Sequence, residues 1–180
     1  MKKIASLALA ICLACPLSAQ TIANMKDLTA GQKAAATSVK LTGTLSIRGN
    51  SDIRQLRDLC WQLKHVDLSM ANCPELPANA FHSRHRLVSV VLPANLKSIG
   101  TQAFFACDAL KQLTLPATLE EVGAAAFSGC SSLESITIEG APRLGGFAFR
   151  GCNNLRSIKL LSKVPPQCDA TAFEGVDIEK

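Results

Sequence analysis

The chain has 180 residues and a formal net charge of +5, with 19 lysines and arginines against 14 aspartates and glutamates. The basic residues are interleaved with acidic ones and form no run, which argues against a basic groove for nucleic acid. No apolar stretch approaches the ~20 residues needed to cross a bilayer, so we also predict no transmembrane segment.

Residues 1–19 predict a secretory signal peptide. A basic pair at the N-terminus precedes an apolar core at residues 4–14, and Ser18-Ala19 offers the small residues of a cleavage site. We therefore expect an exported protein that is secreted or held at the cell surface or outer envelope, with the periplasm as a third compartment. Lipid anchoring at Cys15 is the weaker alternative.

Residues 20–62 show no internal repeat. Val39 and Leu41 alternate with other residues, as in a short strand. Further along, Asn50 and Ser51 are residue types that start helices, and an apolar helical face follows them. That face comprises Ile53, Leu56, Leu59 and Cys60. This part of the chain therefore predicts one strand and one amphipathic helix.

From residue 63 onward the chain repeats every 22 to 24 residues, and an Ala-Phe pair marks each unit. The phenylalanines of these pairs are Phe81, Phe104, Phe127, Phe149 and Phe173. A period in this range predicts a solenoid, in which each unit is one coil that buries its apolar face only by stacking on its neighbours. We expect the phenylalanines to form a spine in the core, with the small alanines allowing adjacent coils to approach.

Each unit begins with apolar residues in the pattern of a short strand with one buried face. The apolar positions are Leu63, Val66 and Leu68; Leu87, Val90 and Leu92; Leu110, Leu113 and Leu115; Leu133, Ile136 and Ile138; and Leu155, Ile158 and Leu160. Pro93 and Pro116 end strand pairing in two units, because proline lacks an N–H. A turn and a short helical or irregular return segment should then close the coil, and stacked strands should form a parallel sheet.

The repeat unit resembles the BspA-like class of leucine-rich repeats, in which an Ile-Gly step, an Ala-Phe pair and a later cysteine follow the strand. This resemblance covers Leu63 to about Phe173, with Arg84 as a departure where later units carry cysteine. It implies an α/β fold, a horseshoe-like leucine-rich-repeat solenoid with a short parallel β-sheet on the concave face and turns or short helical segments on the convex face. It further implies an N-terminal capping region at residues 20–62 and about five repeats at residues 63–180, the last of them incomplete at Lys180.

Six cysteines follow the predicted signal peptide. Three of them stand three residues after a repeat phenylalanine and predict a ladder of small, buried, reduced thiols: Cys107, Cys130 and Cys152. Cys60 and Cys73 lie outside this ladder and are the better candidates for a disulfide in an exported protein. Cys168 has no obvious mate.

The chain offers little that points to catalysis. His82 and His85 have a spacing that could supply two metal ligands, but no further ligand with matching spacing is visible, so we expect loop histidines. Glu120 and Glu121 are adjacent and fit a solvated turn. Neither a nucleophile-elbow motif nor a glycine-rich phosphate loop occurs. We therefore predict no enzyme, no catalytic residue, no bound metal and no cofactor.

The residues between the buried strand positions should project from the concave face as rows. One row is His65, Ser89, Gln112, Ser135 and Ser157, and the next is Asp67, Val91, Thr114, Thr137 and Lys159. A third row at the start of each strand is Lys64, Val88, Lys111, Glu134 and Arg156. Such a surface can offer hydrogen bonds to a partner over a wide area without a deep pocket. At any single position, a merely soluble strand face is the competing interpretation.

Together with the resemblance, these rows indicate a non-enzymatic exported protein for protein–protein recognition or adhesion at the cell surface. The candidate partner is a protein, such as a host or neighbouring-cell surface protein. Two alternatives stay open, a structural envelope scaffold and a truncated remnant without a ligand of its own. Carbohydrate binding ranks lower, because the chain has no tyrosine and Trp61 as its single tryptophan.

Overall fold

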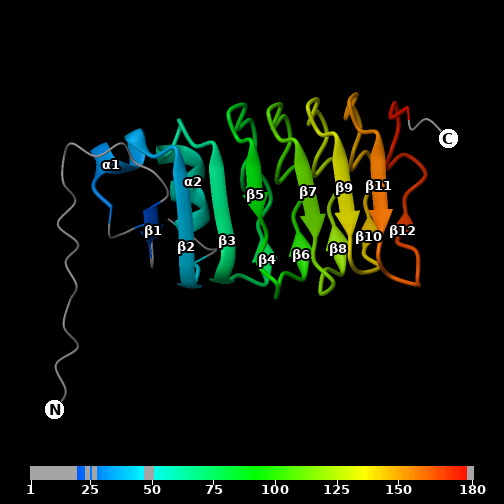
Figure 1. The fold of residues 1–180 in the computed structure, drawn as a ribbon, viewed down its shortest axis with the longest axis horizontal. Helices are drawn as coiled ribbons and strands as arrows, with labels where there is room; N and C mark the ends of the chain where they lie inside the picture. Colours follow the sequence, from blue (N-terminus) through cyan, green and yellow to red (C-terminus); the bar gives the residue numbers. More distant parts are fainter. Residues whose placement is uncertain (1–19, 23–24, 26–27, 47–50, 178–180) are drawn as a thin grey trace, which may run out of the picture.

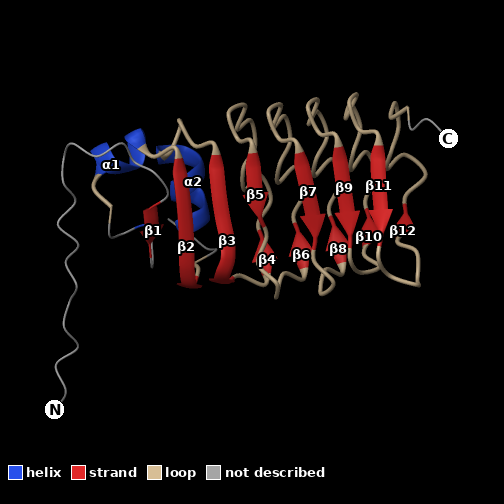
Figure 2. Ribbon diagram, viewed as in Figure 1, coloured by secondary structure: helices blue, strands red, loops and turns tan. Residues whose placement is uncertain are grey.

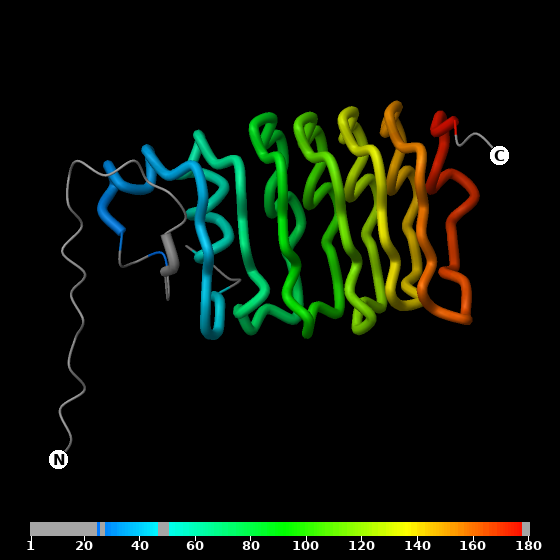
Figure 3. The backbone as a smooth tube through the Cα atoms, in the orientation of Figure 1, coloured from blue at the N-terminus to red at the C-terminus, as the bar shows by residue number. Residues whose placement is uncertain are grey.

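The computed structural model describes residues 20–22, 25, 28–46 and 51–177. In this part of the chain, successive coils stack in sequence order into an elongated solenoid, visible as the parallel loops of the tube in Figure 3. The predicted signal peptide at residues 1–19 and the predicted helix start at Asn50 lie outside the described residues.

The broader side of the solenoid is a seven-stranded parallel sheet (Figure 1). Its strands, in spatial order, are β1 (Gln20–Ile22), β2 (Ser38–Thr44), β3 (His65–Asn72), β5 (Ser89–Val91), β7 (Gln112–Leu115), β9 (Ser135–Ile138) and β11 (Ser157–Leu160). Every pair is parallel and in chain order, as coils that stack one after another require. The predicted solenoid with a parallel sheet is therefore confirmed.

A second parallel sheet forms on the return side of the coils, where the sequence predicted turns or short helical segments. It contains β4 (Glu75–Leu76), β6 (Ser98–Ile99), β8 (Glu121–Val122), β10 (Arg143–Leu144) and β12 (Gln167–Cys168). Each strand has only two residues, and turns fill the rest of the return segment (Figure 2). This sheet forms because adjacent coils stack closely enough for their return segments to form backbone hydrogen bonds. For example, the N–H of Gly100 donates to the carbonyl of Leu76 in the preceding coil at 2.8 Å.

The helices of the described chain are α1 (Ala30–Ala35) and α2 (Asp52–Leu59), both at the N-terminal end (Figure 2). Ser51 caps α2 by accepting a hydrogen bond from the N–H of Arg54 at 3.1 Å. The buried carboxylate of Asp52 accepts bonds from the N–H groups of Met25 at 2.9 Å and Ser46 at 3.0 Å. The first turn of α2 thereby fixes two segments that precede it.

The predicted apolar face of this helix is confirmed in three of its four positions. Ile53, Leu56 and Cys60 are fully buried, but Leu59 is 44% exposed, so the prediction for Leu59 was wrong. Successive helical residues are about 100° apart, which places Leu59 at the margin of the stripe that Cys60 occupies.

The predicted phenylalanine spine is a continuous column of stacked rings. Phe81, Phe104, Phe127 and Phe149 are fully buried, and Phe173 ends the column. Neighbouring ring centroids lie 5.0 to 5.2 Å apart, with interplanar angles between 6° and 15°. This spacing is close to the ~4.8 Å between paired strands, so each coil contributes one ring at the pitch of the sheet.

The last strand departs from the predicted burial pattern. Leu155 is buried, but Ile158 is only partly buried and Leu160 is 47% exposed. Strand β11 is at the edge of the seven-stranded sheet, so no described coil covers its far side.

The predicted cysteine ladder is confirmed: its thiols are buried, and each one donates a hydrogen bond to a backbone carbonyl. Cys107, Cys130 and Cys152 donate to the carbonyls of Phe81, Phe104 and Phe127, one coil earlier, at 3.2, 3.2 and 3.3 Å. Arg84 occupies the same position in the first unit, and its Nη1 donates to the carbonyl of Arg57 in α2 at 2.8 Å. In this unit the carbonyl that accepts the bond belongs to the preceding helix and not to a preceding coil.

The candidate disulfide between Cys60 and Cys73 is not formed, since both residues are free and buried. Cys60 precedes β3 and Cys73 follows it. An eight-residue strand extends about 25 Å at ~3.3 Å per residue, whereas a disulfide needs Cα atoms within ~7 Å. The strand therefore holds the two thiols apart.

We expect one fast-reacting thiol when residues 20–180 are treated with Ellman's reagent at pH 8. Cys168 is exposed, whereas the other five cysteines are buried. Burial also raises the pKa of Cys107 and Cys152 to about 12 and that of Cys60 and Cys73 to about 11, which disfavours the reactive thiolate. The other thiols should react only after unfolding in urea. Loss of the fast phase in Cys168→Ser is the control, and a second fast thiol in the native protein would contradict this prediction.

Candidate binding surface

The outward positions of β3, β5, β7, β9 and β11 form the two rows that the sequence predicted. Pairing aligns His65, Ser89, Gln112, Ser135 and Ser157 in one row. The other row places Asp67 beside Val91, and Thr114, Thr137 and Lys159 in line. All ten side chains are exposed or half-buried, while the residues between them face the core. We call these two rows the sheet face.

The sheet face is broad and mostly polar. His65 Nδ1 and Ser89 Oγ are hydrogen-bonded at 2.8 Å, which links the first two coils of the row. Gln112, Thr114 and Ser157 are exposed. Val91, at 49% exposure, is the apolar exception among the ten. The arrangement can supply several hydrogen bonds to a partner that spans more than one coil.

Strand β2 adds one residue to each row, and the sequence interpretation missed both residues. Ser38 pairs with His65, and Lys40 pairs with Asp67. Lys40 Nζ lies 2.9 Å from Asp67 Oδ2. Partial burial tends to raise the pKa of Asp67, but hydrogen bonds from Ser69 and Lys40 outweigh it, and the pKa is lowered. The alternation of Val39 and Leu41 was the signal that could have placed these neighbours outward.

The third predicted row is where the chain turns into each strand, and we call it the corner row. It comprises Lys64, Val88, Lys111, Glu134 and Arg156, each in the position before a residue of the first row. Backbone hydrogen bonds connect these residues from coil to coil, at 2.7, 3.3, 2.8 and 3.0 Å in order. An open pocket over the last three coils of the row is lined by Lys111, Ser132, Glu134, Asn154 and Arg156.

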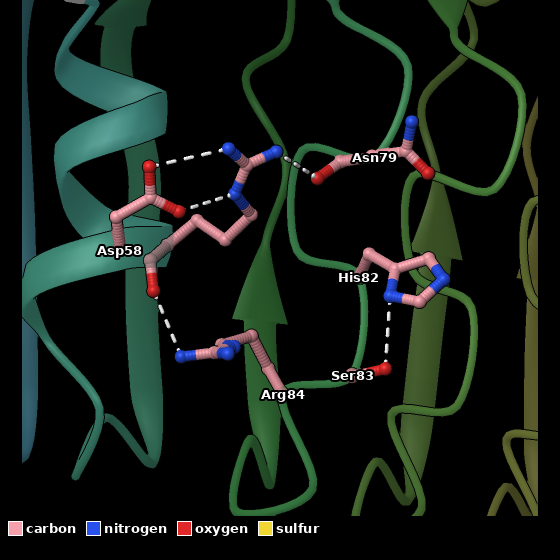
Figure 4. A pocket seen from close by; sticks show the side chains of 6 residues that line it. Asp58, Asn79, His82, Ser83 and Arg84 are labelled. Atoms are coloured by element: carbon pink, nitrogen blue, oxygen red, sulfur yellow. Dashed lines mark hydrogen bonds and ion pairs between the residues drawn. The ribbon is translucent and has the colours of Figure 1, made fainter.

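A separate pocket lies between the end of α2 and the first repeat (Figure 4). Arg57 forms two bonds to Asp58, Nε to Oδ1 at 2.7 Å and Nη2 to Oδ2 at 3.2 Å, and its Nη1 donates to the carbonyl of Asn79 at 3.0 Å. The bond from Arg57 lowers the pKa of the Asp58 carboxyl. Arg84 Nε is buried without a partner in the described chain. Because these charges join α2 to the first coil, we assign the pocket a structural role.

The two candidate metal-ligating histidines have different partners. His82 stacks on Phe105 with ring centroids 5.0 Å apart and bonds to Ser83 Oγ at 2.8 Å. His85 Nδ1 lies 2.7 Å from Asp108 Oδ2. The described residues contain no group of three or more histidine, cysteine or acidic side chains that could hold a metal ion.

The comparisons with known proteins identify the family. The model of the BspA type leucine-rich repeat region, with six copies, matches residues 74–180. The chain belongs to this family. Its members are leucine-rich-repeat proteins, a class that generally binds proteins and is generally non-enzymatic. No curated protein gives a significant match.

Two solved structures of bacterial leucine-rich-repeat proteins share this fold. The T. pallidum leucine-rich-repeat protein is 27% identical with a TM-score of 0.59, and the match covers 75% of this chain and 61% of that one. A leucine-rich-repeat protein from Bacteroides ovatus is 26% identical with a TM-score of 0.50, and the match covers 78% and 36%. This chain thus spans less than two thirds of either protein. In the described residues, no helix has the length and apolar character needed to span a membrane.

Proposed function

We propose that this protein is an exported, non-enzymatic recognition module that binds a protein partner through the sheet face and serves adhesion at the cell surface. The observation that carries the proposal is the alignment of ten outward side chains, most of them polar, across five adjacent strands. A solenoid presents such a surface over many coils, which suits a macromolecular partner better than a small molecule.

Two further points support this proposal. Membership in a repeat family whose proteins generally bind proteins agrees with it. The predicted signal peptide at residues 1–19 would export the chain, and a host or neighbouring-cell surface protein would then be within reach. The boundaries of the signal peptide, the capping region at residues 20–62 and the repeats at residues 63–180 stay predictions.

A capture experiment with matched surface variants tests the proposal. Residues 20–180 are immobilised and exposed to surface proteins from host cells and bacteria. The test variant carries Gln112→Arg and Thr137→Arg on the sheet face. The control carries Ser98→Arg and Gln167→Arg on the second sheet, which adds the same charge elsewhere.

We expect a partner that the unmodified protein and the control retain and that the sheet-face variant loses. Equal retention by all three proteins would overturn the sheet face as the binding site. If no protein is captured at all, the result would favour the structural scaffold or the remnant without a ligand. Binding to glycans on an array that is lost in Trp61→Ala would instead favour carbohydrate binding.

A further inference from the structure

The corner row carries positive charge on alternate coils. Lys64, Lys111 and Arg156 are separated by two coils each, with Val88 and Glu134 on the coils between them. None of these three cations forms an ion pair within the described chain, whereas Lys40, Lys97 and Arg150 each do. Lys64, Lys111 and Arg156 are all exposed. The cations are therefore available to an external partner.

Two carboxylates lie near the row, but neither forms an ion pair with its cations in the described chain. Asp108, in the turn before Lys111, has its Oδ2 2.7 Å from His85 Nδ1 and forms no ion pair with Lys111. Glu134 is exposed and has no ion pair in the described chain, although Lys111 and Arg156 flank it along the row. The open pocket around these three residues also contains Ser132 and Asn154 as polar neighbours. A ligand here meets two cations at the ends and one anion in the middle.

The spacing of the cations restricts the ligand. Strands pair at ~4.8 Å, so cations two coils apart are separated by about 9.6 Å along the solenoid. A polyproline II helix has three residues per turn and a rise of ~3.1 Å, so every third residue returns to the same face after about 9.3 Å. A β-strand fits less well, because its side chains return to one face every ~6.7 Å. A polyproline II segment with an acidic residue at every third position therefore matches the row.

Glu134 distinguishes a peptide from a uniform polyanion. Every nucleotide of a nucleic-acid strand carries a phosphate, with a spacing of ~3.4 Å along each strand of duplex DNA, so a nucleic acid would place phosphates opposite Glu134 as well as opposite the cations. A peptide can instead place neutral residues opposite Glu134. We propose that the corner row binds an acidic polyproline II segment of the protein partner, with carboxylates at every third residue facing Lys64, Lys111 and Arg156. This inference rests on the proposed function, since the corner row borders the sheet face.

Fluorescence anisotropy with labelled peptides tests the spacing directly. The matched probe is Glu-Pro-Pro repeated three times, and the control peptide contains the same three glutamates and six prolines with glutamate at every second position. We expect the matched peptide to bind at least threefold more tightly to residues 20–180. Its affinity should also fall as salt rises from low to physiological concentration, because exposed ion pairs are screened.

Charge variants locate the site. Lys111→Glu with Arg156→Glu should weaken binding of the matched peptide about tenfold, whereas Glu134→Gln should strengthen it about twofold. The control variant carries Lys97→Glu and Arg143→Glu, the same charge change on the return side, and should leave the affinity within twofold. Circular dichroism verifies that each variant is folded.

Equal binding of the two peptides, or equal effects of the two charge variants, would overturn this inference. Tighter binding of a single-stranded oligonucleotide than of the peptide would also overturn it, in favour of a polyanion. If the peptide fails to bind while Gln112→Arg with Thr137→Arg still abolishes partner capture, the proposed function stands and the corner row is not its recognition element. If the peptide binds at the corner row but the variant with Gln112→Arg and Thr137→Arg still captures the partner, the inference stands and the sheet face is not the binding site.

Discussion

Replacing Phe127 with alanine should lower the free energy of unfolding by about 3–5 kcal/mol. Phe127 is fully buried between Phe104 and Phe149, with ring centroids 5.1 and 5.2 Å away and interplanar angles of 6° on both sides. The truncation leaves a cavity in the middle of the column and removes two aromatic contacts of about 0.5–1.5 kcal/mol each. Because a domain is typically stable by only about 5–15 kcal/mol, most of the stability could be lost. Urea unfolding followed by circular dichroism measures the change.

Phe147→Ala is the matched control for this prediction, because it removes the same atoms from a phenylalanine outside the column. Phe147 is 39% exposed, and its ring is 5.4 Å from the guanidinium carbon of Arg150. An exposed cation–π contact contributes about 0.5–1 kcal/mol, so we expect a loss of about 1 kcal/mol or less. Similar losses for Phe127→Ala and Phe147→Ala would show that the column is not the main source of stability.

The features predicted well from the sequence are those that recur at the period of the coil. The Ala-Phe pair recurs five times, and an inward residue that recurs in every coil must stack on its equivalents. The same reasoning placed Gln112 and Thr137 on the outward rows and the cysteines in a buried ladder. Some ion pairs that were not predicted also join residues one period apart, such as Lys97 and Glu120, which are 23 residues apart and lie 2.6 Å from each other.

The features that sequence reasoning missed depend on what lies beside a residue rather than on the period. The strands of the second sheet are two residues long, too short to show an alternation of apolar residues. Leu160 matches the buried pattern, but it lies on an edge strand, so its exposure depends on a neighbour and not on its own position. Arg84 departs from the cysteine pattern because its neighbour is α2, which no repeat alignment includes.

The repeat alignment predicted the residues of the corner row, but it could not show that their cations lack ion-pair partners within the described chain. Along the sequence, basic and acidic residues are interleaved without a run, and this argued against a basic groove for nucleic acid. Coiling aligns residues that are one period apart, so Lys111, Glu134 and Arg156 line one open pocket although they are separated by 23 and 22 residues along the chain. The charge of one face therefore has to be counted down a column of aligned coils, and a count along the chain misses it.

Gly123→Ala should destabilise the protein by about 1–3 kcal/mol, because over-packing a close contact forces the backbone to move. A Cβ at this position would lie 2.6 Å from the backbone nitrogen of Thr101 and 2.8 Å from the carbonyl carbon of Gly100, in the preceding coil. These atoms cannot withdraw without lengthening the hydrogen bond from Gly123 N to Ile99 O, which is 2.7 Å. Urea unfolding measures the loss, and hydrogen exchange at the Gly123 amide should become faster.

The control is Gly31→Ala in α1, where an added Cβ meets no atom within 4 Å. Alanine inside a helix stabilises a protein by roughly 0.5–1 kcal/mol relative to glycine. The same substitution, glycine to alanine, should therefore raise the free energy of unfolding at this position. If Gly123→Ala is instead neutral, adjacent coils can separate without cost, and the small residues of the repeat do not set the coil spacing. Opposite signs for the two variants would show that the spacing is set by close approach of the backbones. The separation of the corner-row cations is twice this coil spacing. The result would therefore also show how rigidly that separation is maintained.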